Sequence, residues 1–124
     1  MANFKTNIKA TNYELTPEIR EHIDHQVSKF EKVLPTNTEE IILDVEVGKS
    51  TNRHNNGNVF RAEFNMKYND EFKRAVETQE DLRTALDLVG DDMVRQIRKA
   101  KEKRSDLFRK GAKRVKSWMK FGKK

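Results

Sequence analysis

The chain contains no cysteine and no long apolar run among its 124 residues. The absence of cysteine excludes disulfide bonds and thiolate metal sites, which is consistent with a cytoplasmic protein. No stretch approaches the roughly 18 apolar residues that a membrane-spanning helix needs. The N-terminal segment MANFKTNIKA also lacks the apolar stretch of a signal peptide. We therefore expect one cytoplasmic domain, since a chain of this length suffices for one modest core and not for two.

Proline is scarce, and the two prolines bracket one helical pattern. Thr16 suits the N-cap of a helix, and Pro17 suits its first position, where no N–H bond is lost. Pro35 then ends the pattern. Between these limits apolar residues recur at steps of three and four, namely Ile19, Ile23, Val27, Phe30 and Leu34. This spacing predicts a helix with one apolar side.

Alternation of apolar and polar residues predicts four half-buried strands. These segments are Phe4–Ile8, Ile41–Val47, Phe60–Tyr68 and Phe72–Thr78, the last of which keeps no single facing. Asn69-Asp70 predicts a short turn before the last strand. The polar stretch Lys49–Asn58 predicts a longer turn with Gly57 in it.

A second helix is predicted from Gln79 onward, where the apolar period returns to three and four. Its apolar stripe consists of Leu82, Leu86, Val89, Met93, Ile97 and Ala100. The element order is therefore β-α-β-β-β-α, with each helix apolar on one side only. We predict an α+β fold in which one four-stranded sheet carries both helices on the same face. We divide the chain into a folded domain over residues 1–108 and a basic tail over residues 109–124.

Charge is distributed unevenly along the chain. Residues 95–124 carry 14 Lys and Arg against two acidic residues, whereas residues 1–94 carry 12 against 18. An acidic body with a basic end favours a polyanionic partner. The alternative is a solvated helix with a frayed tail. Favourable interaction with the helix dipole explains a Lys or two in the last turn, but not fourteen basic residues.

The direction of each basic side chain matters more than their number. At about 100° per residue, with Met93 toward the core, Arg95, Arg98 and Lys99 point outward, and Lys101 and Lys103 flank them. Arg104 returns to the core-facing direction, so the helix is expected to have left the sheet there.

The first helix adds a second basic row on its outer side. This row is formed by His22, His25, Lys29 and Lys32, and nearby Glu18, Glu21 and Asp24 limit it to the C-terminal half of the helix. If the helices lie side by side, the two rows form one basic surface, and contacts to phosphate would make its binding strongly dependent on salt.

The tail allows three interpretations. Apolar Phe108, Ala112, Val115 and either Trp118 or Met119 recur at helical spacing among Lys113, Arg114, Lys116 and Lys120. The tail is either disordered until it binds, a helix that folds on RNA with Trp118 or Phe121 stacked on a base, or a helix on an anionic membrane. We rank these alternatives in that order and expect no membrane partner.

Catalysis and cofactors are not expected. His22 and His25 are spaced to share a metal, but a histidine pair on a helix surface is more often part of a solvated polar face, and no acidic residue completes a convincing ligand set. His54 lies in a polar loop. No nucleophile elbow or phosphate-binding glycine loop is found.

Two groups of residues resemble a known family. Thr16-Pro17-Glu18-Ile19-Arg20 with Lys29-Phe30-Glu31-Lys32 resembles the first helix of the ribosome hibernation promoting factor family, which includes the ribosome-associated inhibitor. Glu80-Asp81-Leu82, Ala85-Leu86-Asp87 and Arg95-Gln96-Ile97-Arg98-Lys99 resemble its second helix. The resemblance covers residues 3 to about 104.

The resemblance implies a fold similar to a double-stranded RNA-binding domain and a partner, the small ribosomal subunit with its 16S rRNA. Family members bind in the mRNA and tRNA channel at the A and P sites, and they inhibit translation by occlusion in starvation or stationary phase. The resemblance implies rRNA contacts at Arg20, Lys29 and Lys32, and at Arg95, Arg98, Lys99, Lys101 and Lys103. A cytoplasmic, ribosome-associated protein that is monomeric when free would follow.

Some features depart from the family pattern. Arg83 and Asp92 stand where relatives often carry an aromatic and a basic residue, which puts contacts by the early turns of the second helix in doubt. Long members add a C-terminal domain that pairs two ribosomes, and we expect no such pairing by this chain alone. Lys113, Arg114, Lys116 and Trp118 are candidate tail contacts. The alternative function is a general basic RNA- or DNA-binding protein without ribosome specificity.

Overall fold

The computed structural model describes residues 3–52 and 57–122, with side chains described for residues 4–50 and 59–103. The elements are β1 (Asn3–Thr11), α1 (Pro17–Val33), β2 (Glu40–Asn52), β3 (Gly57–Tyr68), β4 (Glu71–Gln79) and α2 (Leu82–Gly122). This β-α-β-β-β-α order confirms the prediction.

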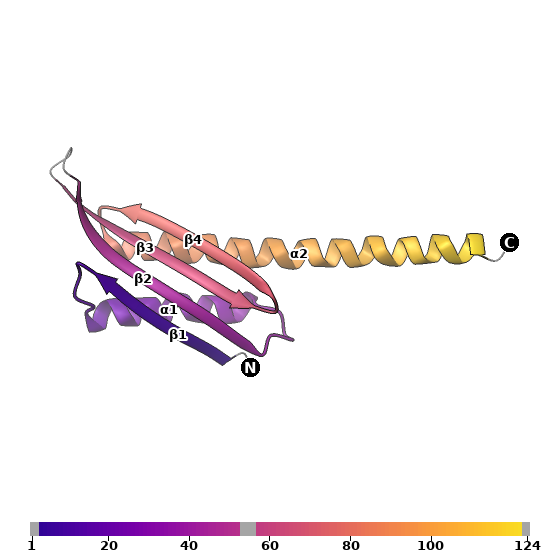
Figure 1. The fold of residues 1–124 in the computed structure, drawn as a ribbon, viewed down its shortest axis with the longest axis horizontal. Coiled ribbons are helices and arrows are strands. Elements are labelled where there is room, and N and C mark those ends of the chain that lie inside the picture. Colours follow the sequence, from indigo (N-terminus) through magenta and orange to yellow (C-terminus); the bar gives the residue numbers. More distant parts are fainter. Residues whose placement is uncertain (1–2, 53–56, 123–124) are drawn as a thin grey trace.

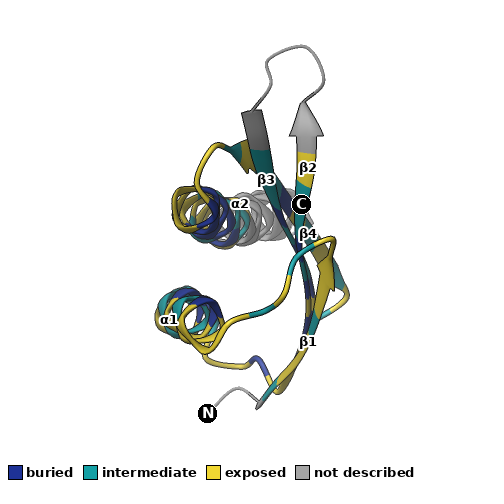
Figure 2. Ribbon diagram, turned by 90° about the vertical axis from the view of Figure 1, so that its left-hand side faces the viewer, coloured by how far each residue is buried: buried dark blue, intermediate teal, exposed yellow. Residues whose placement is uncertain are grey.

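The four strands form one mixed sheet in the order β1-β2-β3-β4. β1 is parallel to β2, while β2–β3 and β3–β4 are antiparallel. Strand alternation sends Leu43, Val45 and Phe64 to one face, where all three are buried. Both helices cover this face and leave the other open (Figure 2), so the predicted α+β architecture is confirmed.

The limits of α1 follow from the residues at its two ends. The backbone N–H of Ile19 donates to Thr16 Oγ1 at 3.2 Å, so Thr16 is the N-cap as predicted. The helix ends before Leu34, whose extended backbone leads into Pro35. Inside the helix Phe30 packs edge-on against Phe64, with ring centroids 5.8 Å apart. This ring contact packs α1 against the sheet.

The two hairpins differ in how well the sequence indicated them. Asn69 and Asp70 have φ of 47° and 62°, which is the left-handed backbone of a two-residue turn, as predicted. The longer turn predicted at Lys49–Asn58 is wrong at both ends, because the strands on either side of it extend into the predicted range. Strand β2 continues to Asn52, which pairs with Gly57. Polar residues can extend a hairpin because the ladder is made by backbone groups; His54 lies outside the described residues.

The burial pattern of β4 explains why the sequence did not show which of its side chains face the helices. Only Ala75 is buried on the helix side, while Phe72 lies on the open face with 56% of its surface exposed. Gln96 of α2 donates from Nε2 to the carbonyl oxygen of Arg74 at 2.8 Å. This hydrogen bond occupies an acceptor on an edge strand, which would otherwise be available to another strand.

Helix α2 begins at Leu82, three residues later than predicted, because Asp81 caps it. Asp81 Oδ2 accepts hydrogen bonds from Thr84 Oγ1 at 2.9 Å and from the Thr84 backbone N–H at 3.2 Å. The Thr84 hydroxyl is the main reason that the pKa of Asp81 lies below its usual 3.8. No helix of the described chain is long and apolar enough to cross a membrane.

The C-terminal half of α2 extends well past the sheet (Figure 1). Its backbone continues without interruption from Leu82 to Gly122, so no helix end marks the division at residue 108. This geometry agrees with the expectation that the helix leaves the sheet near Arg104. The assignment of residues 109–124 as a separate tail, disordered when free, stays a prediction.

Candidate nucleic-acid interface

Helices α1 and α2 lie side by side and run parallel, joined by polar contacts along their seam. In order along both helices, the pairs are Glu18–Arg83 at 3.0 Å, His22–Asp87 at 2.8 Å, Gln26–Asp87 at 3.0 Å and Lys29–Asp91 at 3.6 Å. Asp87 is shared by two side chains of α1. A carboxylate of one helix or the other therefore takes part in each of these contacts.

The two helices approach each other closely at Gly90. Gln26 is fully buried, and a Cβ atom built on Gly90 would lie 1.9 Å from its Oε1. Gln26 Nε2 donates to Asp87, whereas its Oε1 has no hydrogen-bond partner among the described residues. The helices can therefore lie this close only because residue 90 has no side chain.

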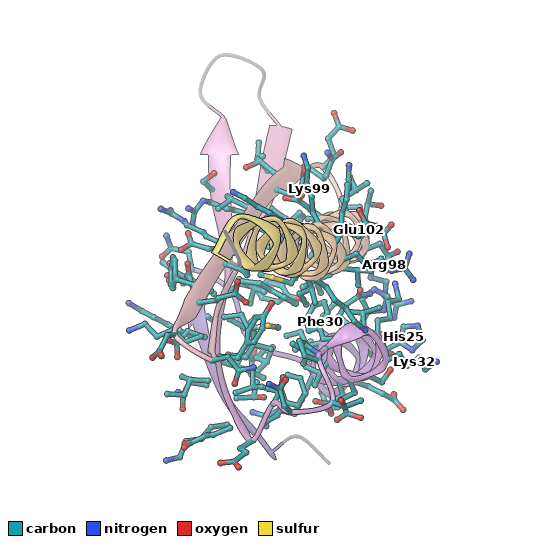
Figure 3. The ribbon with its side chains drawn as sticks, turned by 90° about the vertical axis from the view of Figure 1, so that its right-hand side faces the viewer. His25, Phe30, Lys32, Arg98, Lys99 and Glu102 are labelled. Carbon is teal, nitrogen blue, oxygen red and sulfur yellow. The ribbon has the colours of Figure 1, made fainter. Side chains whose placement is uncertain are left out.

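Toward the C-terminal ends of the paired helices, basic residues outnumber acidic ones. We call the basic surface the set of Lys29 and Lys32 on α1 with Arg95, Arg98, Lys99, Lys101 and Lys103 on α2. Lys29 is partly buried and the other six are exposed. Arg98 on α2 and Lys32 with His25 on α1 project to the side away from the sheet (Figure 3). The structure thus brings the two predicted basic rows together.

The five members of the basic surface that belong to α2 point in three directions around this helix. Helical geometry at 100° per residue turns Arg98 and Lys101 toward α1 and Arg95 outward. Lys99 and Lys103 fall on the flank nearer β4. A surface hollow along the outer side of α2 is lined by Asp91, Val94, Arg95, Arg98, Lys99 and Glu102. A phosphate entering this hollow would meet three cationic side chains and two carboxylates.

The carboxylates are the part of the surface that sequence reasoning did not anticipate. Asp91 holds the ammonium group of Lys29, whose side chain is only 32% exposed. Glu102 lies beyond Arg98 and Lys99 in sequence and is itself exposed. The effective positive charge is therefore lower than the number of basic residues suggests, and it is greatest toward the C-terminal end of the sheet-covered part of α2.

Not every predicted contact joins this surface. Arg20 is exposed, but helical geometry places it on the flank of α1 opposite the residues that contact α2. The side chains of the tail candidates Lys113, Arg114, Lys116 and Trp118 lie outside the described residues. The role of each candidate as a contact stays a prediction.

The histidines have a simpler explanation than metal binding. His22 Nε2 lies 2.8 Å from Asp87 Oδ1 and so belongs to the interhelical seam. The His22 and His25 rings are 6.4 Å apart at their centroids. No group of three histidine or acidic side chains that could hold a metal occurs in the part of the chain that the structure describes.

One sequence signal could have revealed the seam. Gly90 interrupts an otherwise good helix, at a cost of about 1 kcal/mol relative to alanine. A glycine tolerated there points to a close approach by another element. The identity of its partner, Gln26, was not predictable because a polar residue flanking an apolar stripe usually faces water.

Comparison with known proteins gives consistent results. The model of the Sigma 54 modulation protein / S30EA ribosomal protein family matches residues 6–105. The ribosome hibernation promotion factor of Bacillus subtilis is 28% identical over 103 residues, which cover 83% of this chain and 51% of that protein. The chain thus spans about half the length of this curated relative.

Two solved structures share the fold. The N-terminal domain of Thermus thermophilus Protein Y matches with a TM-score of 0.59 and 22% identity, covering 78% of this chain and 97% of that one. A ribosomal subunit interface protein from Coxiella burnetii matches with a TM-score of 0.57 and 16% identity over the same shares. At these identities the likeness concerns the fold alone.

Proposed function

Because this chain belongs to the Sigma 54 modulation protein / S30EA ribosomal protein family, we propose that it is a ribosome hibernation factor. It binds the small ribosomal subunit in the mRNA and tRNA channel, over the A and P sites, and contacts the 16S rRNA. Bound there, it inhibits translation in starvation or stationary phase. The similarity to the Bacillus subtilis ribosome hibernation promotion factor supports this assignment.

The observation that carries the proposal is the basic surface formed by the two helices. Six of its seven cations are exposed. Among them, Arg98 and Lys32 project from the two helices to the side away from the sheet (Figure 3). Each phosphate that a cation neutralises releases condensed counterions, so several such contacts produce strong, salt-dependent binding. The shallow form of the surface suits a folded RNA backbone better than an enclosed small molecule.

The mechanism requires no chemical step. Binding fills the space that mRNA and tRNA would occupy, and inhibition follows from competition for that space. The rigid sheet behind the helices keeps the cations in fixed positions, because α2 packs on β3 and β4 and α1 packs on α2. Preorganisation of this kind reduces the entropy cost of ordering long side chains at the interface.

Co-sedimentation tests ribosome binding directly. Lysate from stationary-phase cells is separated on a sucrose gradient, and the chain is detected in each fraction. We expect it with small subunits and whole ribosomes. Its recovery only in soluble fractions would contradict the proposal. Equal affinity for purified ribosomes and for unrelated duplex RNA would favour a general nucleic-acid-binding protein instead.

Removing three cations tests the assigned surface. We expect the triple variant Arg95→Ala, Arg98→Ala and Lys99→Ala to bind ribosomes more weakly. Its plot of log affinity against log salt should be less steep, by about one unit for each phosphate that the variant no longer neutralises. Folding should change little, since all three residues are exposed. Affinity is measured by filter binding at several salt concentrations.

A matched control distinguishes the effect of where the three cations lie from the effect of removing three positive charges. Lys5, Lys9 and Lys67 are exposed and lie opposite open-face residues of β2, on the side of the sheet away from the helices. Their replacement with alanine removes the same three charges. We expect nearly unchanged affinity for this control. Equal weakening of both triple variants would mean that net charge, and not the helical surface, determines binding.

A further inference from the structure

The packing of the two helices uses one histidine of α1 and leaves the other one free. His22 lies 2.8 Å from Asp87 of α2, and only 22% of its side chain is exposed. His25, on the next turn of α1, is exposed. Its backbone carbonyl accepts a hydrogen bond from Ser28 Oγ at 2.6 Å, but its ring makes no hydrogen bond or ion pair with any residue that the structure describes. The His25 ring is therefore available to an outside partner.

This free ring faces the same side as the basic surface. His25 and Lys32 are seven residues apart, so their side chains leave α1 in directions about 20° apart and about 10 Å apart along the helix axis. Figure 3 shows both of them, with Arg98 of α2, projecting to the side away from the sheet. A polyanion that contacts Lys32 and Arg98 would therefore also lie close to His25.

None of the charged groups around His25 holds its ring. On α1 the groups within one turn are Glu21, His22, Asp24 and Lys29; from α2, Arg83 lines a shallow hollow together with both histidines, and Asp87 and Asp91 lie in the seam. Arg83, Asp87 and Asp91 already have partners on α1. Glu21 is exposed, and an ion pair between two exposed side chains one turn apart contributes little in water. A phosphate outside the helices would therefore meet little competition for this ring.

We propose, on the basis of the ribosome binding inferred above, that His25 in its protonated form is a further phosphate contact of the basic surface, so that ribosome binding tightens as the pH falls. Histidine side chains ordinarily gain a proton between pH 8 and pH 6, whereas lysine and arginine stay charged throughout this range. The neutral ring offers phosphate one N–H donor, and the protonated ring offers two donors and a full charge. Phosphate therefore favours the protonated ring, and the complex takes up a proton.

The affinity for purified ribosomes at pH 8 and at pH 6, at constant ionic strength and magnesium concentration, tests the pH dependence. We expect binding to be tighter at pH 6 by about three- to fivefold, which is the effect of one charge beside a phosphate. The plot of log affinity against log salt should be steeper at pH 6 by about one unit, because one more phosphate is neutralised. Equal affinity and slope at both pH values would overturn the role of His25 and leave the proposed function intact. Absence of binding at both would overturn both.

Three variants assign the response to one residue. His25→Gln keeps a polar side chain that cannot gain charge, so its affinity should be nearly the same at pH 8 and pH 6. His25→Lys is charged at both pH values and should bind at pH 8 about as tightly as the unchanged protein binds at pH 6. The matched control His22→Gln removes the histidine that faces Asp87 and should keep the full pH response. Because His25 is exposed, its replacements should leave the fold intact.

The comparison among these proteins removes any titration of the ribosome itself, which is common to all of them. A His25→Gln protein that keeps the full pH response would overturn the proposal. Loss of the response in His22→Gln would assign it to the interhelical seam and would overturn the proposal as well. Weak binding of His25→Lys at pH 8 would show that a charge at this position does not contact phosphate, with the same consequence.

Discussion

At the scale of single residues, Gly90 and Gln26 determine how closely the helices pack. A buried amide that uses only one of its two polar atoms costs free energy, since an unsatisfied buried group loses its hydration. Gln26 donates to Asp87 but leaves Oε1 facing the space where a Gly90 side chain would lie. The amide therefore limits which residue α2 can carry at this position.

A double-mutant cycle measures this limit. Gly90→Ala should lower the free energy of unfolding by about 2 kcal/mol, because overpacking outweighs the better helix propensity of alanine. In a Gln26→Ala background the same change should raise it by up to about 1 kcal/mol. Urea unfolding of the four proteins checks both signs. A Gly90→Ala effect that is identical in both backgrounds would show that Gln26 is not the obstacle.

Glu63 is the second residue with an unusual environment, on the open face of the sheet. Its carboxylate accepts from Asn65 Nδ2 at 2.7 Å and pairs with Arg61 and, at 3.3 Å, with Arg74. The Asn65 hydrogen bond is the largest cause, and the two guanidinium groups add to it, so the pKa of Glu63 lies below its usual 4.5. The ionised form is thus favoured in the folded protein.

The depressed pKa of Glu63 gives a pH-dependent contribution to stability. A folded pKa below the unfolded one stabilises the protein above about pH 4.5, and this contribution is lost as pH falls through the folded value. Glu63→Gln should therefore cost about 1 kcal/mol at pH 7 and less at pH 3. Thermal unfolding at both pH values measures the difference. Glu14→Gln, at an exposed site, should show no such change; a Glu63→Gln cost that is the same at both pH values would contradict the argument.

At the scale of elements, the interhelical seam competes with the basic surface for charge. Asp91 holds Lys29 at 3.6 Å and also lines the hollow beside Arg95 and Arg98. It therefore strengthens the contact between α1 and α2 and repels phosphate at the same place. On the proposed function, the helix pair is a compromise between its own stability and its affinity for the phosphates of the rRNA.

Asp91→Asn tests this compromise. Removing one negative charge near bound phosphate should tighten ribosome binding by about fivefold at low salt. The gain should shrink as salt rises. Binding curves at two ionic strengths measure the effect. Glu14→Gln, which removes a charge before the N-terminal end of α1, should leave affinity unchanged. Weaker binding by Asp91→Asn would mean that the seam, and not the net charge, dominates.

The elements themselves were largely predictable from the sequence. The apolar stripes of both helices became core residues, as Ile23, Phe30 and Ile97 illustrate. Periodicity works here because one side of each helix is buried against a sheet. It failed at the β2–β3 hairpin, where polar residues continue the strands. It also left the facing of β4 open, because an edge strand buries only Ala75 and exposes Phe72.

At the scale of the whole molecule, charge and packing are separated along α2. The first half of this helix belongs to the core, and residues 95–124 carry 14 of the 26 basic residues. Helical direction was sufficient to predict that Arg95, Arg98 and Lys99 lie away from the core, and all three are exposed. Helical direction could not predict that Arg20 lies outside the basic surface, because this depends on which side of α1 is next to α2. It also could not predict the contacts of Asp87 and Asp91, because their partners belong to α1.

The close contact at Gly90 also bears on the distance between the two rows of cations. Phosphates on a nucleic-acid backbone occur at fixed intervals, so two rows of cations bind best when their separation matches that interval. Gly90 lies about two turns before Arg98 on α2. Because Gly90 has no side chain, α1 can lie close to α2, and this closeness affects how far Lys29 and Lys32 on α1 stand from Arg98 and Lys101 on α2. On the proposed function, a larger residue at position 90 would therefore change which phosphate spacing the basic surface binds best.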